Sequence, residues 1–589
     1  MPLQKNEIIP LTITGVTAEG SGVGRVAAED GGPGFAVFVP FTAVGDVIDC
    51  RLVKLQKNFA YGRIEQLVTP SADRDEARAS SCPAFGRCGG CVWRHVSYAA
   101  ELRYKQQKVA DALERIGGVQ IPVRPILGCD SPDRYRNKAQ YPVAPGPYRP
   151  LVGFYAPRSH RIIAQRDCLL QPAEFAGAVA AVERWMKRAK ATAYDETTRT
   201  GLVRHVYLRQ AQASGELMVC LVCTSGKLPQ PAELVTLLRE AVPGLASVMV
   251  NINRADTNVV LGEQTFVLYG SPSITDTLCG LHFSLSPQSF YQVNRTQAER
   301  LYALAAEAAG LTGEETLLDL YCGTGTIGLS MADKAGQVIG VETVAAAVED
   351  ARRNAADNGI ANAQFLCADA GEVKAWLDER AIRPDVAVID PPRKGCAPEV
   401  VEQIAALEPD RVVYVSCDPA TLARDVKHFA EHGYAPQWAA PVDMFPGTAH
   451  VETVVLLCRQ VAVHHMKLNP SPFEMIKNGE KTIELRLFDE KRQRLKAGDK
   501  IIFTNTVNEE ILNTTIVKLH RFDTFKELYK SLPLLQCGYT AGNVDKATPA
   551  DMEQYYSVEE QKKYGVVGIE LCRPKEITDE CVVLLHKNR

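Results

Sequence analysis

Short apolar runs and helix-length segments alternate between residues 296 and 459, and this alternation constrains the fold of the 589-residue chain more than any other feature. The apolar runs are Thr316–Leu320, Val338–Val341, Phe365–Cys367 and Val386–Ile389. Repeated strand–helix units of this kind form a doubly wound parallel sheet. Ligands bind such sheets at the carboxyl ends of the strands. The sequence therefore predicts an α/β domain with its site at that edge.

Reactive side chains stand at predicted strand ends. Cys417 follows the apolar run Val412–Tyr414, Asp390 ends another run, and Glu452 lies within the apolar segment His450–Val454. A thiol and a carboxylate at neighbouring strand ends are suited to covalent catalysis. A free cysteine alone is more often structural, so the prediction depends on the combination.

A glycine-rich turn follows the first of these strands. Gly323 and Gly325 within Asp319–Thr326 let the backbone approach a ligand at a helix start. The turn lacks the three glycines of the dinucleotide fingerprint. Glu342 is placed for ribose hydroxyls and Asp369 for an adenine. An adenosine cofactor is predicted, and the loop form with the later catalytic residues favours S-adenosylmethionine over NAD.

The amino-terminal 68 residues predict a small β-barrel. Apolar runs at Ile8–Thr14, Phe35–Val39, Val47–Leu55 and Ala60–Leu67 alternate with glycine turns such as Gly20–Gly24. Barrels of the OB type commonly bind oligonucleotides. The segment resembles a TRAM domain, an RNA-binding module of RNA-modifying enzymes, although a purely structural barrel is the alternative.

Four cysteines have a spacing that suits a metal. Cys82, Cys88 and Cys91 lie in a glycine-rich loop, and Cys168 is a distant fourth candidate. The chain has 17 cysteines and no export signal, which favours reduced thiols in the cytoplasm over disulfides. Four thiolates suit either zinc or an iron–sulfur cluster, and cysteines without any metal are the third alternative.

A local excess of cations separates the cysteine loop from the α/β segment, although the net charge of the chain is −4. Cations for phosphates and aromatic rings for bases are typical of single-stranded RNA binding, whereas an ordinary twisted sheet is the alternative. The residues are Arg134, Arg136, Lys138, Arg149, Arg158, Arg161 and Arg166, with Tyr135, Tyr141, Tyr148, Phe154 and Tyr155 among them.

Residues 1 to about 459 resemble the RNA uracil-5-methyltransferases, in particular the branch with a TRAM domain and an iron–sulfur cluster that modifies 23S ribosomal RNA. The resemblance implies a [4Fe-4S] cluster on Cys82, Cys88, Cys91 and Cys168. The motifs that carry it are Ser289–Asn294, Asp319–Thr326, Asp390–Arg393, Ser416–Pro419 and His450–Thr453.

The resemblance also implies the chemistry. The Cys417 thiolate attacks C6 of uracil, C5 accepts the methyl group, and Glu452 removes the C5 proton to give 5-methyluridine. The cofactor contacts expected are Gln292, Tyr321, Gly323, Gly325, Thr326, Glu342, Asp369 and Asp390, although Thr326 stands where the family often has Asn. A tRNA substrate, or a non-catalytic RNA-binding factor in ribosome assembly, are the alternatives.

The carboxy-terminal segment resembles the ASCH family through Gly479–Arg486. Some relatives hydrolyse an acetylated cytidine with a Lys followed three positions later by Thr, but here Glu484 takes that place. An RNA-contacting module is therefore predicted. His464–Pro472 is predicted to be a polar linker, followed by a helix at Phe473–Asn478 and by strands at Lys500–Thr504 and Thr514–Leu519.

A multi-domain α/β chain follows from these patterns, and it is expected to be cytoplasmic and monomeric, without a membrane span. It comprises an OB/TRAM-like barrel, an α/β insert with the cluster, a Rossmann-like methyltransferase domain and an ASCH/PUA-like α+β domain. The boundaries expected are 1–68 for the barrel, 69–124 for the cysteine loop and a helix, 125–285 for the central RNA-binding domain, 286–459 for the methyltransferase domain and 466–589 for the ASCH-like domain.

Overall fold

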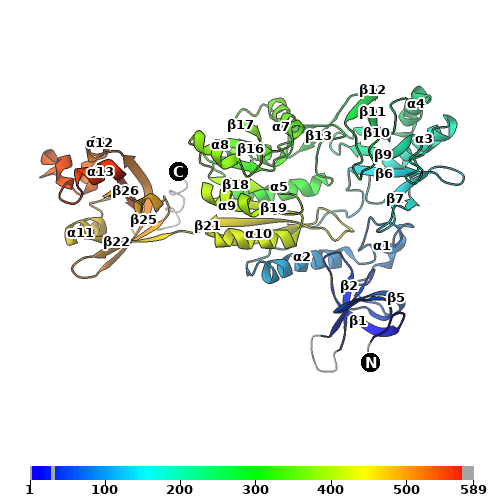
Figure 1. Cartoon of the computed structure of the whole chain (residues 1–589), viewed down its shortest axis with the longest axis horizontal. Coiled ribbons are helices and arrows are strands. Elements are labelled where there is room, and N and C mark those ends of the chain that lie inside the picture. The colour runs from blue at the N-terminus through cyan, green and yellow to red at the C-terminus, as the bar shows by residue number, and fades with distance from the viewer. Residues whose placement is uncertain (1–2, 28–33, 573–589) are drawn as a thin grey trace. The chain divides into compact units, whose positions relative to one another are not determined.

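The computed structural model describes residues 3–27 and 34–572, and the chain divides into two compact units, Met1–Arg459 and Gln460–Arg589. The first unit holds a closed barrel and two seven-stranded sheets, and the second holds a five-stranded sheet (Figure 1). The predicted multi-domain α/β class is confirmed. Among the helices described, none combines the length and hydropathy that a membrane span requires.

The barrel has the strand order β1-β2-β3-β5-β4 and encloses alternate apolar side chains such as Leu11 and Val37. One of its strands lies where a turn was predicted, at Gly20–Gly24. A Cβ at Gly24 would lie 2.6 Å from Leu11, so glycine here permits close strand contact. The strands are β1 (Ile8–Val16), β2 (Gly22–Val26), β3 (Phe35–Val39), β4 (Val47–Leu55) and β5 (Phe59–Thr69).

Two helices, α1 (Glu76–Ser80) and α2 (Tyr98–Arg115), flank the cysteine loop. The first large sheet follows in the order β12-β11-β10-β9-β6-β7-β8 and packs against α3 (Glu174–Arg188) and α4 (Pro231–Ala241). Its strands are β6 (Lys138–Ala144), β7 (Leu151–Tyr155), β8 (Ile162–Ala164), β9 (Val203–Gln210), β10 (Leu217–Cys223), β11 (Leu245–Ile252) and β12 (Gln264–Gly270).

The second large sheet has the order β17-β16-β15-β18-β19-β21-β20, and successive residues of its strands face two separate cores. A two-stranded hairpin, β13 (Ile274–Leu278) and β14 (Leu281–Leu285), precedes it. The strands are β15 (Thr316–Leu320), β16 (Gln337–Glu342), β17 (Ala363–Cys367), β18 (Val386–Ile389), β19 (Arg411–Ser416), β20 (Tyr434–Val442) and β21 (Glu452–Arg459). The helices are α5 (Arg295–Ala309), α6 (Thr326–Ser330), α7 (Ala345–Asp357), α8 (Val373–Glu379), α9 (Pro398–Leu407) and α10 (Pro419–Glu431).

The sequence predicted a doubly wound sheet that is parallel throughout. The observed sheet is only partly parallel. Strands β17, β16, β15, β18 and β19 are parallel, whereas β21 runs antiparallel to both β19 and β20. An antiparallel strand starts at the edge where its parallel neighbours end. The start of β21 therefore lies beside the end of β19. Helix α2 also packs against α10 of this sheet (Figure 1).

The second unit is a five-stranded sheet in the order β22-β24-β25-β26-β23. The linker predicted at His464–Pro472 is wrong, because Met466 and Leu468 are buried on one face of β22, and α11 starts at Pro470. The elements are β22 (Val463–Leu468), α11 (Pro470–Asn478), β23 (Ile483–Leu487), β24 (Lys500–Asn505), β25 (Ile511–Phe522), α12 (Phe525–Ser531), α13 (Val558–Tyr564) and β26 (Val566–Cys572).

Candidate active site

The predicted thiol and carboxylate lie opposite each other in the sheet. Ser416 pairs with Thr453 in the antiparallel ladder of β19 and β21. The next pair outward in this register is Cys417 and Glu452, at the end of one strand and the start of the other. Glu452 is 5% exposed, and Cys417 is half-buried.

Burial controls the protonation of this pair. It raises the pKa of Glu452 well above its usual range, the negative charge of Asp390 raises it further, and Arg393 opposes the shift. Burial also raises the pKa of the Cys417 thiol to about 11, with a further contribution from Glu452 and Asp390. The resting thiol is therefore protonated at neutral pH, and a reaction at sulfur requires that its proton be transferred.

The glycine-rich turn after β15 is held in a left-handed conformation. Tyr321, Gly323 and Gly325 have φ angles of 63°, 55° and 80°. The Gly323 N–H donates to Glu342 Oε2 at 3.1 Å, and the Val344 N–H donates to Oε1 at 2.9 Å. Glu342 thus fixes the turn, and a Cβ at Gly323 would meet no atom within 4 Å, so a ligand can approach the backbone there.

Asp319 supports the turn from below. Its Oδ2 accepts a hydrogen bond from the Gly328 N–H at 2.9 Å, whereas its buried Oδ1 has no hydrogen-bond partner among the residues that the structure describes. Burial raises the pKa of Asp319 to about 7, and the negative charges of Asp390 and Glu342 add to the shift.

The raised pKa of Asp319 predicts a pH-dependent stability. Because the folded protein holds the Asp319 proton more tightly than the unfolded chain, whose pKa is about 3.8, the folded state loses stability as the pH rises from about 4 to about 7. Asp319→Asn should therefore gain stability relative to wild type between pH 4 and pH 8, by on the order of 1–3 kcal/mol. Denaturant unfolding of the ligand-free protein measures this difference. The exposed Asp369→Asn variant is the control, and a difference for Asp319→Asn that is independent of pH would contradict the assignment.

Three other predicted cofactor residues differ in burial and in their hydrogen bonds. Gln292 is buried, and its backbone carbonyl accepts a hydrogen bond from the Asn137 side-chain amide. The Thr326 hydroxyl lies 2.9 Å from the Tyr302 hydroxyl. Asp369 follows β17 and is exposed, and its Oδ1 accepts from the Gly371 N–H at 2.8 Å. The Gln292 backbone and the Thr326 hydroxyl are therefore held by neighbouring residues, whereas Asp369 is exposed to solvent.

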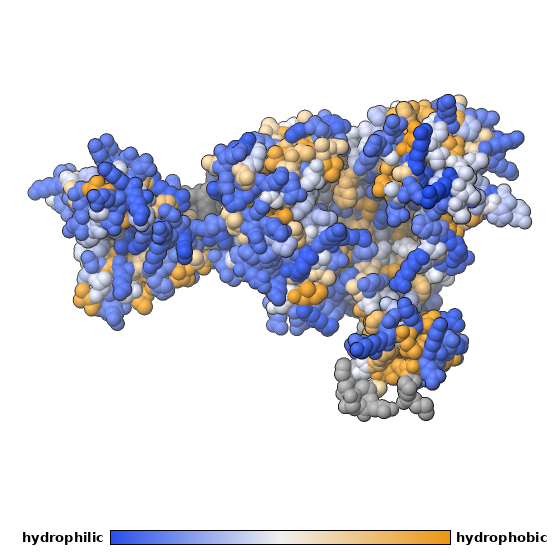
Figure 2. Space-filling view, in the orientation of Figure 1, coloured by the Kyte–Doolittle hydropathy of each residue, from blue (hydrophilic) through white to orange (hydrophobic). Residues whose placement is uncertain are grey.

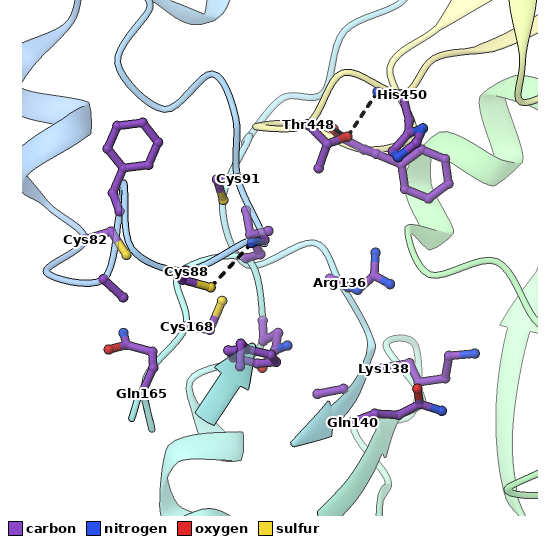
Figure 3. Close-up of a pocket in the computed structure, with 18 of the residues that line it drawn as sticks. Cys82, Cys88, Cys91, Arg136, Lys138, Gln140, Gln165, Cys168, Thr448 and His450 are labelled. Carbon is purple, nitrogen blue, oxygen red and sulfur yellow. Dashed lines mark hydrogen bonds between the residues drawn. The ribbon is translucent and has the colours of Figure 1, made fainter. Parts of the chain in front are cut away.

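The four predicted metal-ligand cysteines line one cavity of about 410 Å³ (Figure 3). Three come from the loop between α1 and α2, and Cys168 follows β8. Burial raises the pKa of Cys91 to about 12, and its strongest thiol neighbour is Cys168. Cys168 in turn interacts electrostatically with Cys88 and Cys82. The fold thus brings the distant fourth cysteine to the other three.

A buried charge network connects the cysteine loop to the loop between β20 and β21, and the sequence did not predict it. Lys105 Nζ donates to Glu101 Oε1 at 2.8 Å and to Asp443 Oδ1 at 2.6 Å. The Gly447 N–H donates to Glu101 Oε1 at 2.6 Å, and the Gly447 carbonyl accepts from Val92 at 2.9 Å. In the sequence, the i,i+4 spacing of Glu101 and Lys105 indicates only the ion pair between these two residues. The loop that leads to Glu452 is therefore fixed to the cysteine segment.

In the second unit, the predicted residues form a buried ion-pair cluster. Lys481 Nζ lies 2.8 Å from Glu484 Oε2, and Arg486 Nε lies 2.9 Å from Glu484 Oε1. The two cations lower the pKa of Glu484 against the effect of burial. At the position where some ASCH relatives have Thr, this chain therefore has Glu484, which is charged and paired with Lys481 and Arg486.

Models of known families match three stretches of the chain. A model described as tRNA (Uracil-5-)-methyltransferase matches residues 171–460, a TRAM model matches residues 2–64, and an ASCH model matches residues 466–575.

Curated relatives extend this similarity over the first unit. A protein named an uncharacterized RNA methyltransferase, from Halalkalibacterium halodurans, is 43% identical over 457 residues, which cover 77% of this chain and 98% of that protein. Another protein of that description, from Clostridium tetani, is 41% identical over 457 residues and covers 78% and 97%.

A solved structure agrees with these sequence matches. The tRNA (uracil-54, C5)-methyltransferase of Pyrococcus abyssi, in complex with S-adenosyl-L-homocysteine, has a TM-score of 0.61 and 27% identity, and covers 76% of this chain and 99% of that one. The sequence matches and the fold match therefore both point to RNA methyltransferases, and the chain that they match contains the strand-end residues and the glycine turn described above. The protein belongs to the S-adenosylmethionine-dependent RNA uracil-5-methyltransferase family.

Proposed function

We propose that the protein forms 5-methyluridine in 23S ribosomal RNA through a covalent bond between Cys417 and uracil C6. The observation that carries the proposal is the position of Cys417 opposite Glu452 at the shared end of β19 and β21. Binding of RNA alone needs neither a thiol nor a buried carboxylate there. The arrangement therefore favours catalysis over a role restricted to ribosome assembly.

The reaction requires that C5 of uracil become nucleophilic. The Cys417 thiol gives its proton to solvent, and the sulfur bonds to C6, which moves the C5–C6 π electrons toward C5 and O4. S-adenosylmethionine, when bound, would supply a methyl group from its sulfonium to C5 and would leave as S-adenosylhomocysteine. Glu452 then takes the C5 proton, the electrons of the C5–H bond form the C5–C6 double bond, and the C–S bond breaks with its electrons on the Cys417 sulfur. A raised pKa of Glu452 suits a proton acceptor that works near neutral pH.

The remaining residues of the sheet edge position the reactants. Asp390 follows β18 between the cofactor turn and Cys417, so it can orient the uracil edge. Glu342 and the Gly323 turn would hold the ribose and the methionine part of the cofactor, with Tyr321 and Gln292 beside them. Because the thiol is half-buried, the target uridine must leave its stack to reach it.

An iron–sulfur cluster fits the four cysteines better than zinc does. In a tetrahedral zinc site with Zn–S bonds of about 2.3 Å, the sulfurs would lie about 3.8 Å apart. In the described part of the chain, no three of the four Sγ atoms lie within 4.8 Å of one another. A [4Fe-4S] cluster would accept sulfurs that lie farther apart than zinc allows, because one cysteine would bind each of four iron atoms. When bound, the cluster would hold the cysteine loop and Cys168 together.

Removal of the cluster should disturb the active site indirectly, because the cysteine loop is fixed to the β20–β21 loop. We expect Cys91→Ser to reduce bound iron and visible absorbance by at least about tenfold and to lower thermal stability. Anaerobic purification with iron analysis measures this, and Cys279→Ser, at an exposed cysteine, is the matched control. An iron-free, colourless wild-type protein would contradict the cluster.

The flanking domains would supply RNA affinity. The barrel presents three aromatic rings, Phe38, Phe59 and Tyr61, with centroids 5.3–5.9 Å apart, and Tyr61 is exposed. Figure 2 shows hydrophobic residues gathered on the barrel surface. Such rings suit base stacking. Under the boundaries proposed from the sequence, the central domain (125–285) and the ASCH-like domain (466–589) would add further RNA contacts.

One experiment distinguishes the ribosomal substrate from the alternative, tRNA. Purified full-length protein is incubated with labelled S-adenosylmethionine and with separate rRNA and tRNA pools, and the labelled nucleoside is mapped. Label in 5-methyluridine of 23S rRNA is expected. Label confined to tRNA would favour the substrate named for the Pyrococcus abyssi enzyme, and no label in either pool would contradict the proposed activity.

A further inference from the structure

The cavity that the four cysteines line also reaches the catalytic loops. Its lining includes Arg393, which follows the Asp390 turn, and Phe445 and His450, which precede Glu452. Figure 3 shows the cysteine sulfurs on one side of the cavity and His450 on another. A ligand in the part of this cavity away from the cysteines would therefore lie between the proposed cluster and the proposed uracil site.

Strand β6 and the residues before it present a polar stripe to the cavity. Arg136, Lys138 and Gln140 alternate along the strand, so their side chains share one face (Figure 3). Asn137 and Ala139 between them are buried. The alternation places two cations and an amide along one wall, at the spacing of a strand.

These cations lack the partners that neighbouring arginines have. In the structure as described, the side chains of Arg136, Lys138 and Arg393 form no ion pair within 4 Å and no hydrogen bond. By contrast, Arg94 pairs with Asp133 at 2.8 Å, and Arg134 pairs with Asp167. None of the described residues that line the cavity is acidic. Arg136 and Lys138 are half-buried, whereas Arg393 is exposed and its charge also acts on Glu452. Half-buried cations such as Arg136 and Lys138, in a cavity without acidic lining, favour an anionic ligand.

Burial bears on Lys138 in particular. It lowers the pKa of Lys138 to about 8, and the positive charges of Arg209 and Arg136 lower it further. A bound phosphate would reverse this effect, because an opposite charge favours the ammonium form.

Aromatic side chains complete the walls. Phe445 and His450 pack edge to face with ring centroids 6.1 Å apart, and Phe85 and Phe154 line the cavity elsewhere. Cations together with exposed ring faces are what proteins use for single-stranded RNA.

We propose that this cavity binds the nucleotide next to the target uridine in single-stranded RNA, with Arg136 and Lys138 on its phosphate and the Phe445–His450 pair against its base. The inference rests on the proposed function for the identity of the RNA, but not for the contacts themselves. Arg393 borders both sites and would hold the phosphodiester that joins the two nucleotides. The cluster then forms part of the wall of a recognition site, and the flanking nucleotide contributes to substrate choice.

The test measures RNA binding without methyl transfer. A labelled oligouridylate of about twelve nucleotides is titrated with full-length protein at several salt concentrations. Each phosphate contact that is lost should reduce the slope of log K against log salt by about 0.7. Lys138→Met should lower the slope by about that amount, and Arg136→Met with Lys138→Met by about twice that amount. Lys138→Arg should restore it, and Lys187→Met, at an exposed lysine on α3, should leave it unchanged.

Two further measurements separate the outcomes. Visible absorbance and S-adenosylhomocysteine binding should stay at wild-type values in Lys138→Met. An unchanged salt slope with lost absorbance would overturn the proposal and assign the cations to charge balance of the cluster. An unchanged slope in a variant that still forms 5-methyluridine would overturn it while leaving the enzymatic function intact. A reduced slope for Lys138→Met, together with a wild-type protein that forms no 5-methyluridine, would support RNA binding in the cavity and contradict the proposed reaction.

Discussion

Replacement of Cys417 by alanine is expected to lower methyl transfer by at least about 10⁴-fold, because alanine lacks the sulfur that forms the proposed bond to C6. The thiol is half-buried at a strand end, so alanine leaves a small gap and should not disturb the fold. The variant should still bind S-adenosylhomocysteine and RNA with wild-type affinity. Single-turnover transfer of labelled methyl to RNA measures the loss.

The matched control is Cys367→Ala, an exposed cysteine at the end of β17. It should retain wild-type activity, because β17 lies at the far edge of the sheet from β19. Residual transfer by Cys417→Ala above about one hundredth of the wild-type rate would mean that C5 is activated without this thiol.

Glu452→Gln is expected to stop the reaction at a different point. Glutamine keeps the shape of glutamate but cannot accept a proton, so thiol attack and methyl transfer proceed and the C5 proton stays in place. Turnover should fall by about 10²–10⁴-fold. A covalent protein–RNA complex that contains the transferred methyl group should accumulate on a denaturing gel with ordinary uridine RNA.

Glu399→Gln, at an exposed glutamate in the first turn of α9, is the control and should form no lasting complex. Loss of turnover without a trapped complex would indicate that Glu452 acts earlier, in the removal of the thiol proton. Wild-type turnover by Glu452→Gln would exclude it as the base.

Much of the second large sheet could be predicted because its strands are uninterrupted apolar runs. Strands β15 and β18 have the bounds that the sequence predicted, since both are buried on two faces. The glycines of β2 predict a turn from the sequence alone, whereas in the structure Gly24 allows close contact with Leu11 within a strand. Strand β22 was missed because its polar residues alternate with only two buried ones.

The arrangement of the site depended on information that a single sequence does not hold. The motifs identified Cys417 and Glu452 separately, but only the antiparallel direction of β21 places them opposite each other. Lys105 and Asp443 are 338 positions apart, and nothing local links them. The role suggested for Lys138 follows from the absence of a carboxylate around it in the described cavity, which depends on tertiary structure.

The most direct test of covalent catalysis is to identify the residue that bonds to the RNA. The protein is incubated with S-adenosylmethionine and 5-fluorouridine RNA, whose C5 fluorine cannot leave as a proton, and the adduct is digested and sequenced by mass spectrometry. The proposed mechanism predicts a modified nucleotide on Cys417, in the peptide that contains Ser416 and Asp418. An adduct on another cysteine, or no adduct under conditions in which uridine RNA is methylated, would contradict it.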